Sequence, residues 1–136
     1  VSQWCMLDLS KRTAVDLRAV AESHNDAIVE CPSPAEKPRK VPAPDAEPVL
    51  THKVAYSDID FNRHVNTMRY IEMMLDVLPI ERFAEERPLR LDINFLKEAR
   101  YGQTPSVALE ERGSQTLVEI RSDAGAALCR GAFEWR

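Results

Sequence analysis

A short polar run in the middle of the chain holds the residues whose types are best suited to chemistry. Asp60, Asn62 and His64 alternate within residues 57–64. Histidine titrates near neutral pH, so His64 can take up and release protons under working conditions. The amide of Asn62 can donate a hydrogen bond to a developing negative charge or fix a neighbouring group. Asp60 can act as a base, a nucleophile or an orienting carboxylate, and the sequence leaves these three roles open.

Each of these residues also has a structural explanation. Asp, Asn and Ser side chains commonly cap helices or order loops, and for any one residue taken alone that explanation is the better one. Asp58 is explained well enough in this way and receives no chemical role. A calcium loop is a further alternative, because Asp58, Asp60 and Asn62 imitate its first ligands. Such a loop needs glycine and glutamate where this chain has Arg63 and Arg69, so calcium is excluded.

A strand and a helix flank the polar run and must position it. Residues 49–56 have strand character. Asn66 can cap a helix that begins at Thr67 and continues to about Leu78, where Pro79 ends it. Apolar residues spaced i, i+3, i+4 and i+7 predict one buried helix face. These residues are Ile71, Met74, Leu75 and Leu78.

Four further strands are predicted after the helix, at residues 89–95, 107–112, 115–122 and 127–135. The first alternates apolar and polar residues, which is typical of a half-buried strand. The last is expected to place Ala127, Cys129, Phe133 and Trp135 on one face. A strand, a helix and four closely connected strands predict an α+β protein with the hotdog fold. In this fold an antiparallel sheet wraps around one long central helix.

The N-terminal third of the chain looks different. Residues 3–9 are predicted to form a strand, and residues 14–22 a short helix with Thr13 as its N-cap. Residues 31–48 contain six of the nine prolines. Because proline fixes φ and lacks an amide donor, this stretch is expected to be an extended, poorly structured linker.

Composition narrows the class of protein. The 136 residues suffice for one ordinary domain and a tail, and the net charge of −4 argues against non-specific nucleic-acid binding. No run is long and apolar enough for a bilayer, and no signal peptide is evident, so a soluble cytoplasmic protein without membrane association is expected. Cys5, Cys31 and Cys129 have neither CxxC nor zinc-ligand spacing and are expected to be reduced thiols. The opening at Val1, directly before strand-like residues, suggests a fragment of a longer protein.

Residues 56–70, YSDIDFNRHVNTMRY, resemble the D-x-N-x-H-V-N signature of plant and bacterial acyl-acyl-carrier-protein thioesterases. In that family the second of two hotdog domains supplies the catalytic residues. By motif position, the resemblance assigns them to Asp60, Asn62 and His64, and to Glu98 on the strand after the helix. Glu98 can orient the imidazole of His64 or polarise a water molecule directly. The helix that follows the motif also presents amide donors that could bind a thioester carbonyl.

The likeness extends over the whole chain. Residues 4–6, with Arg12, resemble the end of the family's first hotdog domain, and the prolines lie where the family joins its two domains. The resemblance therefore implies three parts. They are a remnant of a first hotdog domain at 1–30, a proline-rich linker at 31–48 and the catalytic C-terminal hotdog domain at 49–136.

The activity implied by the resemblance is hydrolysis of a fatty acyl thioester to free fatty acid and carrier protein, in fatty acid biosynthesis. The implied partner is acyl-carrier protein with a phosphopantetheine-linked acyl chain. Basic residues of this kind usually form only a solvated surface, but some of them could receive the acidic carrier protein or the phosphate: Lys37, Arg39, Lys40, Lys97 and Arg100. No metal or organic cofactor is expected, and a homodimer could form through hotdog pairing. Many plant members have a cysteine, once proposed as the nucleophile, after the glutamate. Here that residue is Ala99, so a thiol mechanism at this position is impossible.

Two alternatives remain open at this point. The first is a hotdog thioesterase acting on acyl-coenzyme A, since such enzymes share a looser version of the motif. The second is a non-catalytic hotdog module that binds acyl chains or dimerises. His24 and His52 lie outside any constellation and receive no role. The preferred acyl-chain length and the role of each catalytic residue are not determined by the sequence.

Overall fold

The computed structural model divides the chain into two compact units, Val1–Pro38 and Arg39–Arg136. The boundary between them falls inside the predicted linker. Among the described residues, none of the helices has the length and apolar character needed to cross a membrane. The structure describes residues 2–8, 10–11, 13–27, 31–32 and 36–136.

The first unit is a short hairpin followed by helical turns. Strands β1 (Leu7–Asp8) and β2 (Thr13–Ala14) pair antiparallel, and α1 (Arg18–Ser23) leads into a 3₁₀ turn at Asn25–Ala27. None of its described side chains is buried. The strand expected over residues 3–9 is therefore found only at β1, and Leu9 and Arg12 lie outside the described residues.

The predicted N-cap at Thr13 is wrong. Thr13 pairs with Asp8 in the β1–β2 ladder, and the helix begins only at Arg18. The carboxylate of Asp16 accepts the Arg18 amide at 3.0 Å and also pairs with the Arg18 side chain. The local capping pattern is thus overridden by strand pairing.

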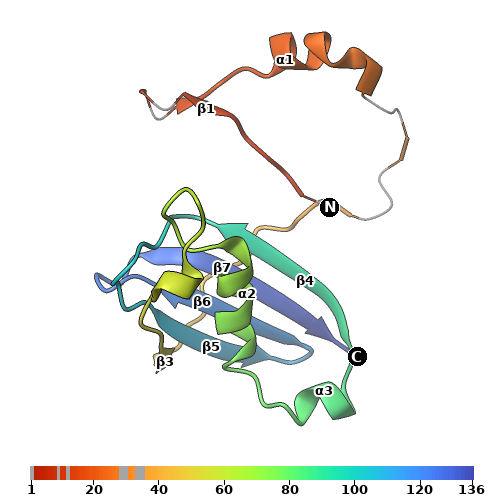
Figure 1. Ribbon diagram of the computed structural model, residues 1–136. Coiled ribbons are helices and arrows are strands. Elements are labelled where there is room, and N and C mark those ends of the chain that lie inside the picture. Colours follow the sequence, from red (N-terminus) through yellow and green to blue (C-terminus); the bar gives the residue numbers. More distant parts are fainter. Residues whose placement is uncertain (1, 9, 12, 28–30, 33–35) are drawn as a thin grey trace. The chain divides into compact units, whose positions relative to one another are not determined.

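The second unit is one antiparallel sheet with a helix across one face (Figure 1). The strand order is β3-β5-β6-β7-β4, and helix α2 (Thr67–Leu75) contacts the sheet mainly over β6. A 3₁₀ turn (Tyr56–Asp58) precedes α2, and the short helix α3 (Arg82–Glu85) follows it. This is the α+β architecture predicted for a hotdog fold. The strands are β3 (Pro48–Thr51), β4 (Pro88–Phe95), β5 (Ser106–Arg112), β6 (Gln115–Arg121) and β7 (Ala127–Trp135).

The core lies between α2 and the sheet, but the buried helix face differs from the predicted one. Tyr70, Met73 and Met74 are the buried residues of α2, whereas Leu75 is 37% exposed. A Cβ at Gly131 on β7 would lie 2.6 Å from the sulfur of Met74. Glycine at this position therefore lets α2 approach the sheet closely. The other buried residues of this core include Val54, Val65, Val107, Val118, Ile120, Leu128, Cys129, Phe133 and Trp135.

Helix α2 also ends three residues earlier than predicted. Its last residue is Leu75, and the Leu78 amide bonds back to the Leu75 carbonyl at 3.0 Å as the chain tightens into a turn. Pro79 accounts for this, because its ring clashes with the preceding helical turn and disfavours helical geometry at Leu78. Leu78 nevertheless stays buried in the core, as expected.

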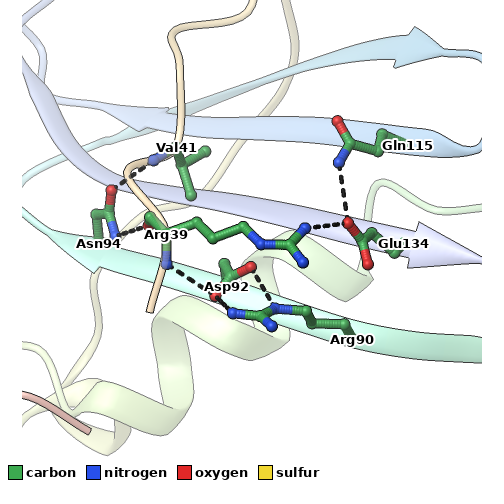
Figure 2. Close-up of polar contacts among 7 residues, drawn as sticks. All are labelled: Arg39, Val41, Arg90, Asp92, Asn94, Gln115 and Glu134. Carbon is green, nitrogen blue, oxygen red and sulfur yellow. Dashed lines mark hydrogen bonds and ion pairs between the residues drawn. The ribbon is translucent and has the colours of Figure 1, made fainter. Parts of the chain in front are cut away.

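The second half of the proline-rich stretch is hydrogen-bonded to side chains of the sheet, so the expectation of poor structure is wrong for residues 39–47, here called the strap. Figure 2 shows its first residues lying along the sheet. The Val41 amide donates to Asn94 Oδ1 at 2.7 Å, and Asn94 Nδ2 donates to the Arg39 carbonyl at 3.0 Å. The Arg39 amide donates to Asp92 Oδ1 at 3.2 Å, and its guanidinium pairs with Glu134.

An apolar contact adds to these hydrogen bonds. Val41 is only 2% exposed and packs against Leu117 and Ala132, which face each other on β6 and β7. Their neighbours along those strands, Val118 and Phe133, belong to the core beneath α2. Since successive strand residues point to opposite faces, the strap covers the face of the sheet that α2 does not.

Candidate active site

The motif residues lie on a tight loop between the 3₁₀ turn and α2. Ile59 and Val65 form an isolated antiparallel bridge, and the Asp60 amide donates to the His64 carbonyl at 2.9 Å. Arg63 sits at the loop tip with a φ of 63°, and its amide donates to the Asp60 carbonyl at 3.0 Å. These hydrogen bonds hold the backbone of the short loop in one conformation.

The Asp60 carboxylate holds this loop together from inside. Its Oδ1 accepts the amide of Asn62 at 2.8 Å and the amide of His64 at 3.2 Å. These are the bonds of an Asx-type turn, in which a short acidic side chain replaces a backbone acceptor. Of the three roles that the sequence leaves open for Asp60, this geometry favours the orienting one.

His64 and Glu98 are brought together although thirty-four positions separate them. His64 Nε2 lies 3.2 Å from Glu98 Oε2, with the two side chains 29% and 55% exposed. The resemblance implies that Glu98 lies on the strand after α2. In the structure it lies three residues beyond Phe95, the last residue of β4. The Val65 amide donates to the Ala99 carbonyl at 2.9 Å, so the backbones beside the two residues are joined directly.

Asn62 is exposed on the same loop. The structure shows its backbone amide bonded to Asp60, and within the described residues no side-chain hydrogen bond links it to His64 or Glu98. Asp60, Asn62 and His64 therefore share one short loop. Glu98 joins them through its tertiary contact with His64.

The N-terminus of α2 is capped as predicted. Asn66 Oδ1 accepts the Met68 amide at 2.9 Å, and the Arg69 amide donates to the Asn66 carbonyl. The Met68 amide is therefore already engaged, which removes one of the helix donors expected to be available for a thioester carbonyl.

A second polar cluster lies at the base of the loop, and it contains His52, to which the sequence assigns no role. The carboxylate of Asp58 is buried and accepts the Ala55 amide at 2.7 Å and His52 Nε2 at 2.9 Å. Arg69 of α2 approaches it at 3.6 Å, and the Asp58 carbonyl accepts the Asn66 amide at 2.8 Å. Asp58 thus joins the segment that follows β3, the loop and α2, which agrees with its predicted structural role. His52 gave no signal because its partner is set by the turn between them rather than by a motif.

The pKa of Asp58 follows from these contacts. Burial alone would raise it, but the Ala55 amide, His52 and Arg69 together lower the pKa below its ordinary value. The carboxylate is therefore ionised at neutral pH and holds its three partners at the foot of the motif loop.

Comparison with known proteins decides what kind of domain carries this loop. Residues 43–136 match the acyl-ACP thioesterase C-terminal domain. The chain belongs to the acyl-ACP thioesterase family. Its structure is similar to that of an acyl-ACP thioesterase from Bacteroides thetaiotaomicron, with 30% identity, a TM-score of 0.83, and coverage of 96% of this chain and 53% of that protein. The 12:0-ACP thioesterase from Umbellularia californica shares the fold, with 17% identity, a TM-score of 0.77, and coverage of 96% and 52%.

A plant acyl-ACP thioesterase is also similar in sequence. The chain is 28% identical to the acyl-[acyl-carrier-protein] hydrolase FATB3 of Cuphea viscosissima over 87 residues, which are 60% of this chain and 21% of that protein. The chain thus spans about half the length of the solved acyl-ACP thioesterases that it matches, 53% and 52%. These solved structures confirm the predicted hotdog fold.

Two positions in this acyl-ACP thioesterase domain, Ala99 and Cys129, bear on whether a cysteine thiolate could be the nucleophile. Ala99, at the position after Glu98, is fully buried, so a side chain there points into the core. Burial raises the pKa of the Cys129 thiol to about 12, which leaves it protonated at neutral pH. Cys5 and Cys31 are exposed in the first unit. Neither Ala99 nor Cys129 can supply a nucleophilic thiolate.

Proposed function

We propose that this chain is the catalytic half of a thioesterase that hydrolyses the bond between a fatty acyl chain and the phosphopantetheine of acyl-carrier protein. The observation that carries the proposal is the 3.2 Å between His64 Nε2 and Glu98 Oε2. His64 and Glu98 come from separate segments of the chain, and both can transfer a proton. Both lie within residues 43–136, which match the family's C-terminal domain. A histidine paired with a carboxylate is suited to activate a water molecule.

The reaction follows from this pair. The Glu98 carboxylate, 3.2 Å from His64 Nε2, favours the form of the imidazole that carries a proton on Nε2, which leaves Nδ1 as the acceptor for a proton of the attacking water. The water oxygen forms a bond to the thioester carbon while its proton moves to His64. Collapse of the tetrahedral intermediate breaks the carbon–sulfur bond, and His64 returns the proton to the departing thiolate. The products are a free fatty acid and the carrier thiol.

The remaining motif residues have supporting roles in this proposal. Asp60 orients His64 by holding its amide at 3.2 Å. The exposed amide of Asn62, two residues before His64, donates to the oxyanion that develops on the carbonyl. A single donor of this kind typically stabilises the transition state by about 3–4 kcal/mol.

The substrate class is tested with the full-length protein and matched acyl-carrier and acyl-coenzyme A thioesters of the same chain length. We expect kcat/KM to be higher for the carrier-linked substrate, and His64→Ala to abolish hydrolysis of both. Equal or faster turnover of the coenzyme A ester would favour the acyl-coenzyme A alternative. Binding of acyl chains without hydrolysis of either ester would favour a non-catalytic module.

The wider setting is also part of the proposal. We place the reaction in fatty acid biosynthesis on the strength of family membership, and in the cytoplasm on the strength of the chain's composition. Residues 1–30 are proposed to belong to a preceding hotdog domain, with residues 31–38 linking it to the catalytic unit. The length of the solved relatives supports this, since the chain covers 53% of the Bacteroides thetaiotaomicron protein.

A further inference from the structure

The backbone next to Glu98 is held from two sides although it lies outside any strand or helix. Ala99 is fully buried, and both its backbone groups have partners from other segments. Its carbonyl accepts the Val65 amide at 2.9 Å, which ties it to the motif loop. Its amide donates to the Tyr70 hydroxyl oxygen at 2.7 Å, which ties it to α2.

Tyr70 is an unusual residue for the core of a small domain, because it buries a polar group there. It is 4% exposed on the sheet-facing side of α2, and its ring meets that of Phe95 edge-to-face with centroids 5.9 Å apart. Burial raises the pKa of the hydroxyl, so it stays protonated and neutral. A leucine or phenylalanine would fill the same space without a buried oxygen.

The bond acts on Glu98 through a single peptide plane. The Ala99 amide and the Glu98 carbonyl belong to the same planar peptide unit, so fixing the Ala99 N–H fixes the backbone from which the Glu98 side chain projects. Without the hydroxyl, the Ala99 amide would be a buried donor with no acceptor, and the segment would shift to find one. Such a shift would separate Glu98 Oε2 from His64 Nε2.

We infer that Tyr70 is a positioning residue for the reaction, because its hydroxyl holds the Glu98 backbone where the carboxylate meets His64. This inference rests on the proposed function, since it assigns Tyr70 a part in the action of the His64–Glu98 pair. The link from Tyr70 to the pair runs through the hydrogen bond between its hydroxyl and the Ala99 amide.

The test compares Tyr70→Phe with the unmodified full-length protein. The ring and its packing remain, and only the oxygen is lost. Because small misplacements of catalytic groups can cost about 10²-fold in rate, we expect kcat to fall about 10- to 100-fold with KM changed less than about 2-fold. Tyr101→Phe is the matched control, since it removes a hydroxyl from a side chain that is 69% exposed, and kcat should stay at the unmodified value.

The second arm combines the substitution with Glu98→Gln. If Tyr70 acts through Glu98, adding Tyr70→Phe to Glu98→Gln should lower kcat little further. The same fold-loss in both backgrounds would show a general structural effect and overturn the inference, as would an unchanged kcat in Tyr70→Phe alone. An unchanged kcat in Glu98→Gln would instead contradict the proposed function itself.

Folding is checked by thermal denaturation before any rate is interpreted. Should Tyr70→Phe not fold, 3-fluorotyrosine at this position keeps the oxygen in place and weakens it as an acceptor. A smaller fall in kcat at unchanged KM is then expected, and a kcat equal to that of the unmodified protein would overturn the inference.

Discussion

At the scale of single residues, the sequence predicts best where partners are close in the chain. Asn66 caps α2 through the Met68 amide, and Asp58 orders its own loop through the Ala55 amide. In both hydrogen bonds the partners are at most three positions apart in the sequence. No local pattern marks Tyr70 or His52. The Tyr70 hydroxyl contacts Ala99, twenty-nine positions away, and the contact of His52 with Asp58 depends on the turn between them. Sequence periodicity also predicts that Ile71 and Leu75 lie on the buried face of α2, whereas Leu75 is 37% exposed in the structure. Periodicity does not predict the burial of Tyr70, whose hydroxyl oxygen accepts a hydrogen bond from the Ala99 amide in the core.

Asp58 gives a residue-scale prediction about stability and pH. Because its pKa is lower in the folded protein, the ionised carboxylate stabilises the fold at pH values above its unfolded pKa of about 3.9, and this contribution is lost as the pH falls through the folded pKa. We expect Asp58→Asn to lower the free energy of unfolding by about 1–3 kcal/mol at pH 7. The deficit relative to the unmodified protein should shrink below about pH 4.

The measurement is chemical denaturation of both proteins over a series of pH values. Asp76→Asn removes the same charge from an exposed position at the end of α2 and should change stability by less than about 0.5 kcal/mol. A deficit for Asp58→Asn that stays constant down to pH 3 would show that ionisation of this carboxylate does not matter to the fold.

At the scale of elements, periodicity and turn residues predict the strands well, and tertiary contacts decide the exceptions. The four strands after α2 lie where their alternation and turns place them, within a residue or two at each end. The strap is the main error. Its prolines correctly predict extended backbone, but an extended chain can be loose or packed, and only the side chains of the sheet decide which. Asn94 is one of these, and nothing local marks it as the partner of Val41.

Asn94 therefore provides an element-scale prediction. Its side chain both accepts from the Val41 amide and donates to the Arg39 carbonyl. Asn94→Ala removes both bonds and should lower the free energy of unfolding by about 1–3 kcal/mol. Asn94→Asp keeps the acceptor and loses the donor, so an intermediate loss is expected in the same urea titration. Unchanged stability of Asn94→Ala would mean that the strap does not contribute to the fold.

At the scale of the whole molecule, the described sheet ends in two unpaired edges. The strand order leaves β3 and β4 outermost, and β4 is the longer, with eight residues against four. Leu89 and Phe95 on β4 are 59% and 51% exposed. An exposed, apolar edge strand is a template for pairing with another chain. The sequence suggested this property through the hotdog fold, whereas the identity of the edge strand needed the three-dimensional order.

We predict that the chain of residues 1–136 on its own self-associates and is a poor enzyme. Sedimentation and turnover measured on the same samples should show dimers or larger species with low activity. Leu89→Glu on β4 should weaken the association, while Val49→Glu, at a 65% exposed position on the short β3, should not. Full activity from a strictly monomeric chain would contradict the prediction.

The central claim is that His64 and Glu98 act on the attacking water as one unit, and a double-mutant cycle on kcat tests it most directly. In the full-length protein, His64→Ala and Glu98→Gln should each lower kcat by about 10²–10⁴-fold, the usual cost of losing one acid–base group. The double mutant should be little worse than the poorer single mutant, because residues that work together show non-additive losses. Losses that multiply fully in stably folded variants, or a Glu98→Gln protein with normal kcat, would contradict the account.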